Sequence, residues 1–291
     1  MRHEPREAPS PASTVSLSSM LALTPGPSSS SVSYHFGGPA LSPAHRQIAV
    51  EMLAIDAMRI RCGEGPAFRS WNERRLGGSP HNPLREGAIR AYAGIGFGLP
   101  ESPSNEDHLQ GLVAELFWSR LILELPQTAD GRQLVKLHAA KPDPLEPGGD
   151  GLAIYETNDG QLIFRLWEIK KHDTQKRVSA TINRAGKQLS TRGHEYLAKL
   201  AGPETMETPD ALGDLYREII ELWLDKSARA GVGISVGTSD EHQPKGSRSF
   251  KSLAKTFPTF VNAGQLESIV VAIPAFPGFA LAVREEIWKG L

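Results

Sequence analysis

Three residues in two neighbouring segments have the types and the spacing for metal-assisted chemistry. The first segment reads Pro147-Gly-Gly-Asp150-Gly, and the second reads Leu162-Ile-Phe-Arg-Leu-Trp-Glu168-Ile-Lys170. Asp150 and Glu168 offer the carboxylate oxygens that magnesium prefers as ligands. Lys170 would project from the same strand face as Glu168, because side chains repeat with a period of two. Hydrolysis of a phosphodiester requires a divalent cation and a group that positions water, so this set indicates that chemistry.

The turn between the two segments predicts their register. A three-residue loop, Asn158-Asp159-Gly160, with its glycine left-handed in a G1 bulge, would pair Thr157 with Gln161. In that register Asp150 lies directly opposite Glu168, with Cβ atoms roughly 5 Å apart. A two-residue loop would shift the register by one and send the two carboxylates to opposite faces of the sheet. We therefore predict the three-residue loop.

Glu115 is a further carboxylate, in a segment that is apolar around most of its circumference. Glutamate is almost never fully buried without a partner. One interpretation is a salt bridge to Arg120 or another base. The other is a role in the catalytic site as an additional metal ligand, bound directly or through water.

The elements that must position these residues follow from periodicity and capping signals. Ser42 as N-cap and Pro43 at N1 predict the start of a helix, and Ser104 or Asn105 is expected to cap a buried helix over residues 107–125. Strands are expected at 134–138, 151–155, 162–169, 232–236 and 269–273, and further helices at 178–200, 209–228 (capped by Thr208), 250–262 and 279–291. This order predicts an α/β fold with a central mixed β-sheet flanked by helices.

The chain divides by composition into three parts. Residues 1–43 are rich in Ser, Pro and Ala, which predicts a disordered tail. Residues 44–104 form an N-terminal helical and loop region, in which the Gly- and Pro-rich stretch 63–105 is expected to be mostly loop with one short element near residues 85–92. Residues 105–291 form the domain that carries the candidate site.

These motifs resemble the PD-(D/E)xK superfamily of restriction and repair nucleases over roughly residues 105–200. The resemblance rests on Glu115 in a helix, on Gly149-Asp150-Gly151, and on Glu168-Ile169-Lys170 in an apolar strand. One departure is that Gly149-Asp150 stands where the family name has Pro-Asp. More narrowly, the size and layout resemble the nuclease subunit of Hachiman phage-defence systems, whose partner is a helicase.

The resemblance implies a fold, a cofactor and a set of roles. The fold is a restriction-endonuclease-like αβββαβ core. Asp150 and Glu168 would bind Mg²⁺, with Mn²⁺ as an alternative, and Lys170 would assist hydrolysis. The backbone carbonyl of Ile169 would be an extra ligand, and Gln188 would be the glutamine that some members carry on the next helix. The implied function is a metal-dependent nuclease, acting on DNA, in a bacterial anti-phage defence or restriction system.

A basic segment flanks the motif. Residues 165–199 contain nine Lys or Arg and three Asp or Glu, in a protein whose formal net charge is −1. A phosphate backbone would require such a patch beside an acidic metal pocket, although a solvated helix face has the same composition. The residues expected to contact nucleic acid are Lys171, Lys176, Arg177, Arg184, Lys187 and Gln188. A second cluster, Lys245, Arg248 and Lys251, is interpreted as a solvated loop, and His172 as an exposed loop histidine rather than a proton carrier.

Composition excludes several other classes. Cys62 is the single cysteine, which rules out an intramolecular disulfide framework and a cysteine-cluster zinc site. No apolar run is long enough for a membrane span, so a cytoplasmic protein with no membrane contact is expected. The alternative function is a non-catalytic nucleic-acid-binding or assembly module that retains the nuclease fold.

Overall fold

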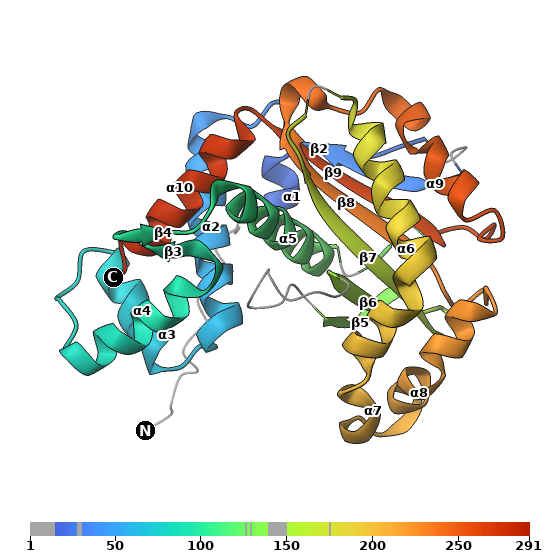
Figure 1. The fold of residues 1–291 in the computed structure, drawn as a ribbon, viewed down its shortest axis with the longest axis horizontal. Helices are drawn as coiled ribbons and strands as arrows, with labels where there is room; N and C mark the ends of the chain where they lie inside the picture. The colour runs from blue at the N-terminus through green and yellow to red at the C-terminus, as the bar shows by residue number, and fades with distance from the viewer. Residues whose placement is uncertain (1–14, 28–30, 126, 129, 139–149, 175) are drawn as a thin grey trace, which may run out of the picture.

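A seven-stranded mixed β-sheet organises the residues that the computed structural model describes, which are 15–27, 31–125, 127–128, 130–138, 150–174 and 176–291. The strand order is β1-β2-β9-β8-β7-β6-β5, and the sheet is curled (Figure 1). β2, β9, β8 and β7 run parallel, while β1, β6 and β5 are antiparallel to their neighbours. Their bounds are β1 Thr24–Pro25, β2 Ser33–Gly37, β5 Gln133–His138, β6 Gly151–Glu156, β7 Leu162–His172, β8 Val232–Ser239 and β9 Leu266–Ile273. The predicted α/β class with a central mixed sheet is confirmed.

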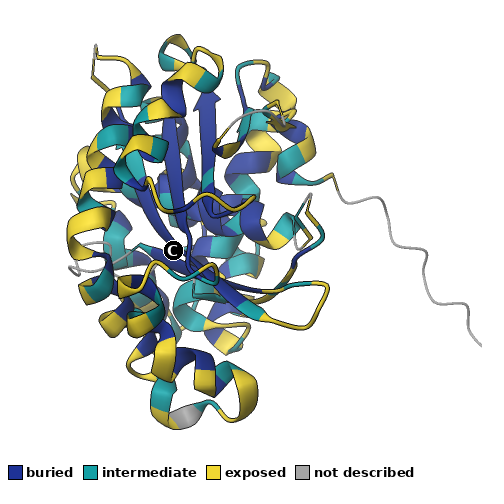
Figure 2. Cartoon of the chain, turned by 90° about the vertical axis from the view of Figure 1, so that its right-hand side faces the viewer, coloured by how far each residue is buried: buried dark blue, intermediate teal, exposed yellow. Residues whose placement is uncertain are grey.

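Helices cover both faces of the sheet, and each face has its own hydrophobic core. α1, α2, α5 and α10 lie on one side, and α6, α8 and α9 lie on the other (Figure 1). In Figure 2 the strands are buried between helices whose outer surfaces are exposed. The helix bounds are α1 Leu17–Met20, α2 Pro43–Cys62, α3 Pro66–Arg75, α4 Pro83–Phe97, α5 Glu106–Glu124, α6 Val178–Ala201, α7 Glu204–Glu207, α8 Asp210–Leu224, α9 Lys251–Thr256 and α10 Phe276–Trp288, with 3₁₀ turns η1 Asp240–His242 and η2 Gly246–Phe250; β3 Gly98–Leu99 and β4 Ser102–Pro103 pair separately.

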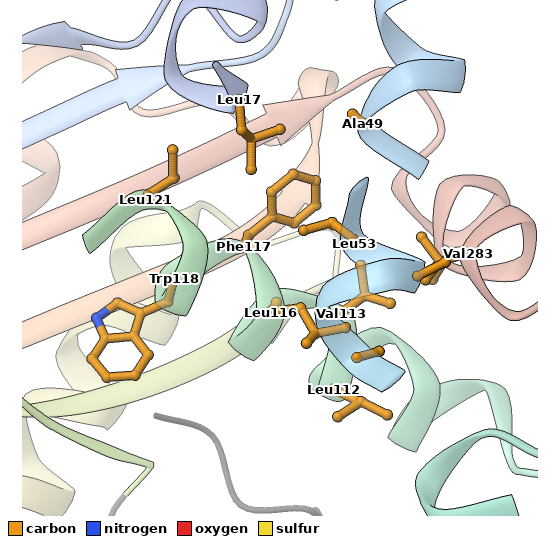
Figure 3. Packing of buried hydrophobic residues seen from close by; sticks show 14 of the residues in the cluster. Leu17, Ala49, Leu53, Leu112, Val113, Leu116, Phe117, Trp118, Leu121 and Val283 are labelled. Atoms are coloured by element: carbon orange, nitrogen blue, oxygen red, sulfur yellow. The ribbon is translucent and has the colours of Figure 1, made fainter. Parts of the chain in front are cut away.

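α5, the helix that carries Glu115, is capped at its N-terminus and buried by neighbouring elements. Of the two predicted cap residues, Asn105 is the N-cap of α5, and its side chain accepts a hydrogen bond from the Asp107 N–H at 2.7 Å. Phe117 and Trp118 are fully buried, and Figure 3 shows Phe117 among side chains from α1 and α2. This packing fixes the position of α5 beside β7.

The N-terminal segment differs from its predicted disorder. Leu17 of α1 is fully buried, and the N–H groups of Leu17 and Ser18 donate to the Glu124 carboxylate at 2.9 and 2.8 Å. β2 extends the sheet by pairing in parallel with β9. Residues 15–27 and 31–43 are therefore part of the fold, since burial of apolar groups against distant elements offsets their ordering entropy. Residues 1–14 lie outside the described residues.

Two smaller predictions are also corrected. The stretch expected to be mostly loop contains α3, which was not predicted, and α4, which includes the short element predicted near residues 85–92 and is longer. These helices begin at Pro66 and Pro83, each at the first helical position. Both helices share one core with α5 and α10. Thr208 is not the cap of α8, whose N-cap is Pro209. Among the described residues, no helix is long and apolar enough to cross a membrane.

Candidate active site

The hairpin of β6 and β7 has the predicted register. Gly160 has φ +80°, and the Thr157 N–H donates to the Gln161 carbonyl at 2.9 Å, as a three-residue loop with a G1 bulge requires. The ladder runs from Glu156 opposite Leu162 to Gly151 opposite Trp167. The next position along this register places Asp150 opposite Glu168, where β6 ends and β7 continues.

Gly151 allows α5 to pack directly on the start of β6. A Cβ on Gly151 would lie 2.0 Å from the Cη2 atom of Trp118. Only glycine permits this approach, so the Trp118 ring on α5 packs directly over the start of β6. The glycine after the aspartate is thus required by the packing of α5 on the strand.

Asp150, Glu168 and Lys170 meet on one side of the sheet. The Ile169 N–H donates to Asp150 Oδ2 at 2.7 Å, which fixes the aspartate beside β7. Lys170 Nζ lies 3.8 Å from Asp150 Oδ2 and contacts Glu168 Oε1. The lysine and aspartate side chains are partly exposed, whereas Glu168 is fully buried. The ammonium group therefore bridges two carboxylates at an opening to solvent.

The charges of the site are strongly coupled. Burial, followed by repulsion from Asp150, raises the pKa of Glu168 to about 7. Burial acts to lower the pKa of Lys170, but Asp150 and Glu168 outweigh it and the pKa is raised. The amine thus stays charged while Glu168 titrates near neutrality, and such a perturbed pair is typical of functional sites.

Glu115 belongs to the same cluster. Burial, followed by the charge of Asp150, raises the pKa of its carboxyl group well above the ordinary value. Arg120 does not pair with Glu115: its Nε donates to Glu124 at 2.7 Å and its Nη1 lies 3.3 Å from Asp56. Arg120 is therefore not the partner of Glu115, and the bases whose charges act on its carboxylate are Lys170 and Arg61.

The donor set fits a hard divalent cation held by few protein ligands. Apart from the ion pair with Lys170, neither carboxylate oxygen of Glu168 has a hydrogen-bond partner among the described residues. In a strand the N–H and C=O of one residue point to the same neighbour, so the Ile169 carbonyl points past the end of β6, toward Asp150. The described residues contain no group of three or more His, Cys, Asp or Glu side chains arranged to hold a metal. Magnesium needs only one or two carboxylates besides water and substrate phosphate. The segment 139–149, which includes Gly149, lies outside the described residues.

The residues expected to contact nucleic acid have different surroundings. Lys171 lies on the α5 side of β7, where its ammonium is held by Asp107 and Asp173. Its charge is already compensated. Gln188 Nε2 donates to the Tyr196 hydroxyl at 2.8 Å on the site side of α6. The others are exposed at the start and on the outer face of α6: Lys176, Arg177, Arg184 and Lys187.

Arg192 is a residue of the site that sequence reasoning missed. Its guanidinium lies 5.2 Å from the centre of the Tyr196 ring, and its charge partly opposes the rise in the pKa of Glu168. Gln188, Arg192 and Tyr196 are spaced four residues apart, which places them on one face of α6. That spacing was the available signal, and it shows which helix face borders the catalytic opening.

His172 also differs from expectation. It is buried rather than exposed, and its Nδ1 and Nε2 contact Thr181 Oγ1 and the Lys176 carbonyl oxygen, both at 2.8 Å. Its ring therefore ties the end of β7 to the start of α6.

Comparison of the chain with known protein-family models gives no match, and comparison with curated proteins gives none either. The residues of the site and their geometry are therefore the basis for a functional proposal.

Proposed function

We propose that the protein is a metal-dependent nuclease that hydrolyses phosphodiester bonds, with DNA as its substrate. The observation that carries the proposal is the meeting of Asp150, Glu168 and Lys170 where β6 ends and β7 continues. Three further features support it: the third carboxylate of Glu115, the raised pKa of Glu168, and the element order α5-β5-β6-β7-α6, which β8 follows after α7 and α8. Apart from the inserted α7 and α8, this order is compatible with the αβββαβ core that the resemblance implies.

Asp150 and Glu168 would hold the cation, Mg²⁺ or Mn²⁺, with the Ile169 carbonyl as a further ligand and Glu115 acting through water. When bound, the ion polarises the phosphate and activates a water molecule. The hydrogen bond from the Ile169 N–H keeps the Asp150 carboxylate oriented toward the opening. Lys170 is protonated and partly exposed, so it can orient water or offset negative charge that develops on the phosphate.

The biological setting proposed for this activity is a cytoplasmic anti-phage defence or restriction system. Resemblance to the Hachiman nuclease subunit supports a helicase as the partner. The alternative is a module that binds nucleic acid or assembles with a partner without cleaving. The two functions differ in one measurement, which is metal-dependent cleavage.

The test is cleavage of circular, linear and single-stranded DNA, and of RNA, by the purified protein with Mg²⁺ or with EDTA. Wild-type protein should cleave only with the metal, and Glu168→Ala should not cleave. Glu221→Ala is the matched control, because Glu221 is exposed on α8, away from the site. Full cleavage by Glu168→Ala would refute the assignment of the site. Metal-independent binding without cleavage by the wild type would instead support the non-catalytic alternative.

A further inference from the structure

Two basic segments that are distant in the sequence line one hollow at the end of the sheet. The hollow has a volume of about 610 Å³, and its basic lining residues are Lys176 and Arg177, before α6, and Lys245 and Arg248, after β8. The second pair belongs to the cluster that the sequence suggested was a solvated loop. The structure places it against the basic segment that follows the catalytic strand.

The four cations are exposed, and none forms an ion pair with a carboxylate of the described residues. Lys171 provides the contrast, since its charge is held between two aspartates. One carboxylate, that of Glu241, is found among the described residues lining the hollow, and it lies 3.9 Å from His242 Nε2. An excess of uncompensated positive charge around a concave surface favours an anion.

The first turn of α6 adds donors to the same surface. Val178 and Ser179 line the hollow, and Arg177 at the N-cap provides no side-chain cap for the helix. α6 has 24 residues, and backbone N–H groups and the helix dipole favour negative charge at such an end.

The walls of the hollow are joined by buried contacts through His172. Besides its contacts to Lys176 and Thr181, its carbonyl oxygen accepts a hydrogen bond from Thr238 Oγ1 at 2.8 Å, and its ring lies edge-on to His242 at 5.1 Å. The Lys245 N–H donates to the buried Ser249 hydroxyl oxygen at 2.9 Å. The backbone on both sides is thereby fixed before a ligand arrives, which lowers the cost of binding.

We propose that this hollow binds a backbone phosphate of the nucleic-acid strand whose cleavage we propose above. β7 runs from Glu168 at the catalytic opening to His172 at the hollow, roughly 13 Å at 3.3 Å per residue. A nucleic-acid strand rises about 3.4 Å per nucleotide, so the bound phosphate lies about four nucleotides from the cleaved bond. The distance of about four nucleotides from the cleaved bond rests on the proposed function, whereas phosphate binding at the hollow does not.

The test measures binding without cleavage. Affinity for fluorescent DNA oligonucleotides of 4 to 16 nucleotides, single-stranded and duplex, is determined in EDTA over a series of salt concentrations. The variant is Lys176→Gln with Arg248→Gln, and the control, with the same change of net charge, is Lys136→Gln with Lys255→Gln on other exposed surfaces. All four positions are exposed, so thermal unfolding should be unchanged.

We expect the hollow variant to bind long oligonucleotides about tenfold more weakly than the control, and the slope of log K against log salt to fall by about 1. Equal binding by variant and control at every length would overturn the inference, and magnesium-dependent cleavage would still stand as a separate result. If wild-type protein never cleaves but the variant loses affinity, phosphate binding at the hollow is supported and the nuclease proposal fails.

The same assay distinguishes backbone phosphate from a free nucleotide. Inorganic phosphate and a mononucleotide are added as competitors against the longest oligonucleotide. If the hollow binds backbone phosphate, displacing the labelled oligonucleotide should require a far higher concentration of either competitor than of unlabelled oligonucleotide, counted per phosphate group. Competition at equal concentration would overturn the assignment in favour of a mononucleotide site.

Discussion

Replacing Glu168 by glutamine should stabilise the metal-free protein and abolish catalysis at the same time. The glutamate is fully buried, and its pKa is raised from 4.5 to about 7 by burial and by Asp150. A carboxyl group whose pKa is higher in the folded state disfavours folding once it ionises. Its protonated form imposes no such cost, so the wild-type protein loses stability as pH rises from 4.5 through 7. Glutamine does not titrate and keeps a similar shape.

The magnitude follows from the pKa. At 1.36 kcal/mol for each pH unit, a rise from 4.5 to about 7 corresponds to about 3 kcal/mol. The advantage of Glu168→Gln should therefore grow from under about 1 kcal/mol at pH 5 to about 3 kcal/mol at pH 8. In a protein of this size that is a rise in Tm of roughly 5 to 10 °C.

The assay is chemical and thermal unfolding in EDTA between pH 5 and 8.5, with Glu221→Gln as the exposed control. Adding Mg²⁺ should reduce the difference in stability between Glu168→Gln and the wild type, because a cation that binds only the folded wild-type protein raises the stability of that protein. A stability difference that does not change with pH would refute the reasoning about Glu168. So would a variant that still cleaves DNA at the wild-type rate.

Three further predictions test the surrounding structure. Lys170→Met should lower cleavage by about 100-fold or more while the Mg²⁺-induced rise in Tm remains, since the carboxylates stay in place; loss of that rise would contradict the role given to the lysine. Gly151→Ala should destabilise the fold by about 1 to 3 kcal/mol in denaturant titrations, because its Cβ would overlap the ring of Trp118. Leu17→Ala should cost about 2 to 4 kcal/mol, as measured by urea unfolding, because this side chain is fully buried under α5. A neutral effect of Leu17→Ala would mean that the N-terminal segment is not part of the folded core.

Local sequence signals were sufficient to predict that Asp150 and Glu168 face each other in the candidate site. The three-residue turn determines which residues face each other across the hairpin, so counting from Gly160 places Asp150 opposite Glu168 without a structure. The Asn105 cap and the apolar circumference of α5 were equally local. Such features depend on residues a few positions apart, and sequence patterns record them directly.

Features that depend on distant contacts were not predictable in the same way. The segment around Leu17 has the composition of a disordered chain, and it is ordered because it contacts Glu124 and pairs with β9. Likewise, Lys245 and Arg248 carry no signal of their own, and their meaning comes from Lys176 and Arg177 across the hollow. α3 and the full length of α4 are a different case. Both helices have a local signal in a proline at the first helical position, and the glycines around them do not prevent helix formation.

The pairing of β2 with β9 has a consequence for how the molecule assembles. Ser33 lies beside Glu267, so this edge forms only after the chain has been synthesised beyond residue 267. Closing a loop of this length costs conformational entropy, and the contacts between β2 and β9 offset that cost only after they have formed. Pairing between residues so far apart in the sequence is therefore a late step of folding. The elements carrying the carboxylates and the lysine are consecutive, from α5 to α6, and can come together first. We therefore expect a folding intermediate in which the carboxylates and the lysine of the site are already together. In this intermediate the apolar surface on the α5 side of the sheet is still exposed. Exposed apolar surface makes such a species prone to aggregation.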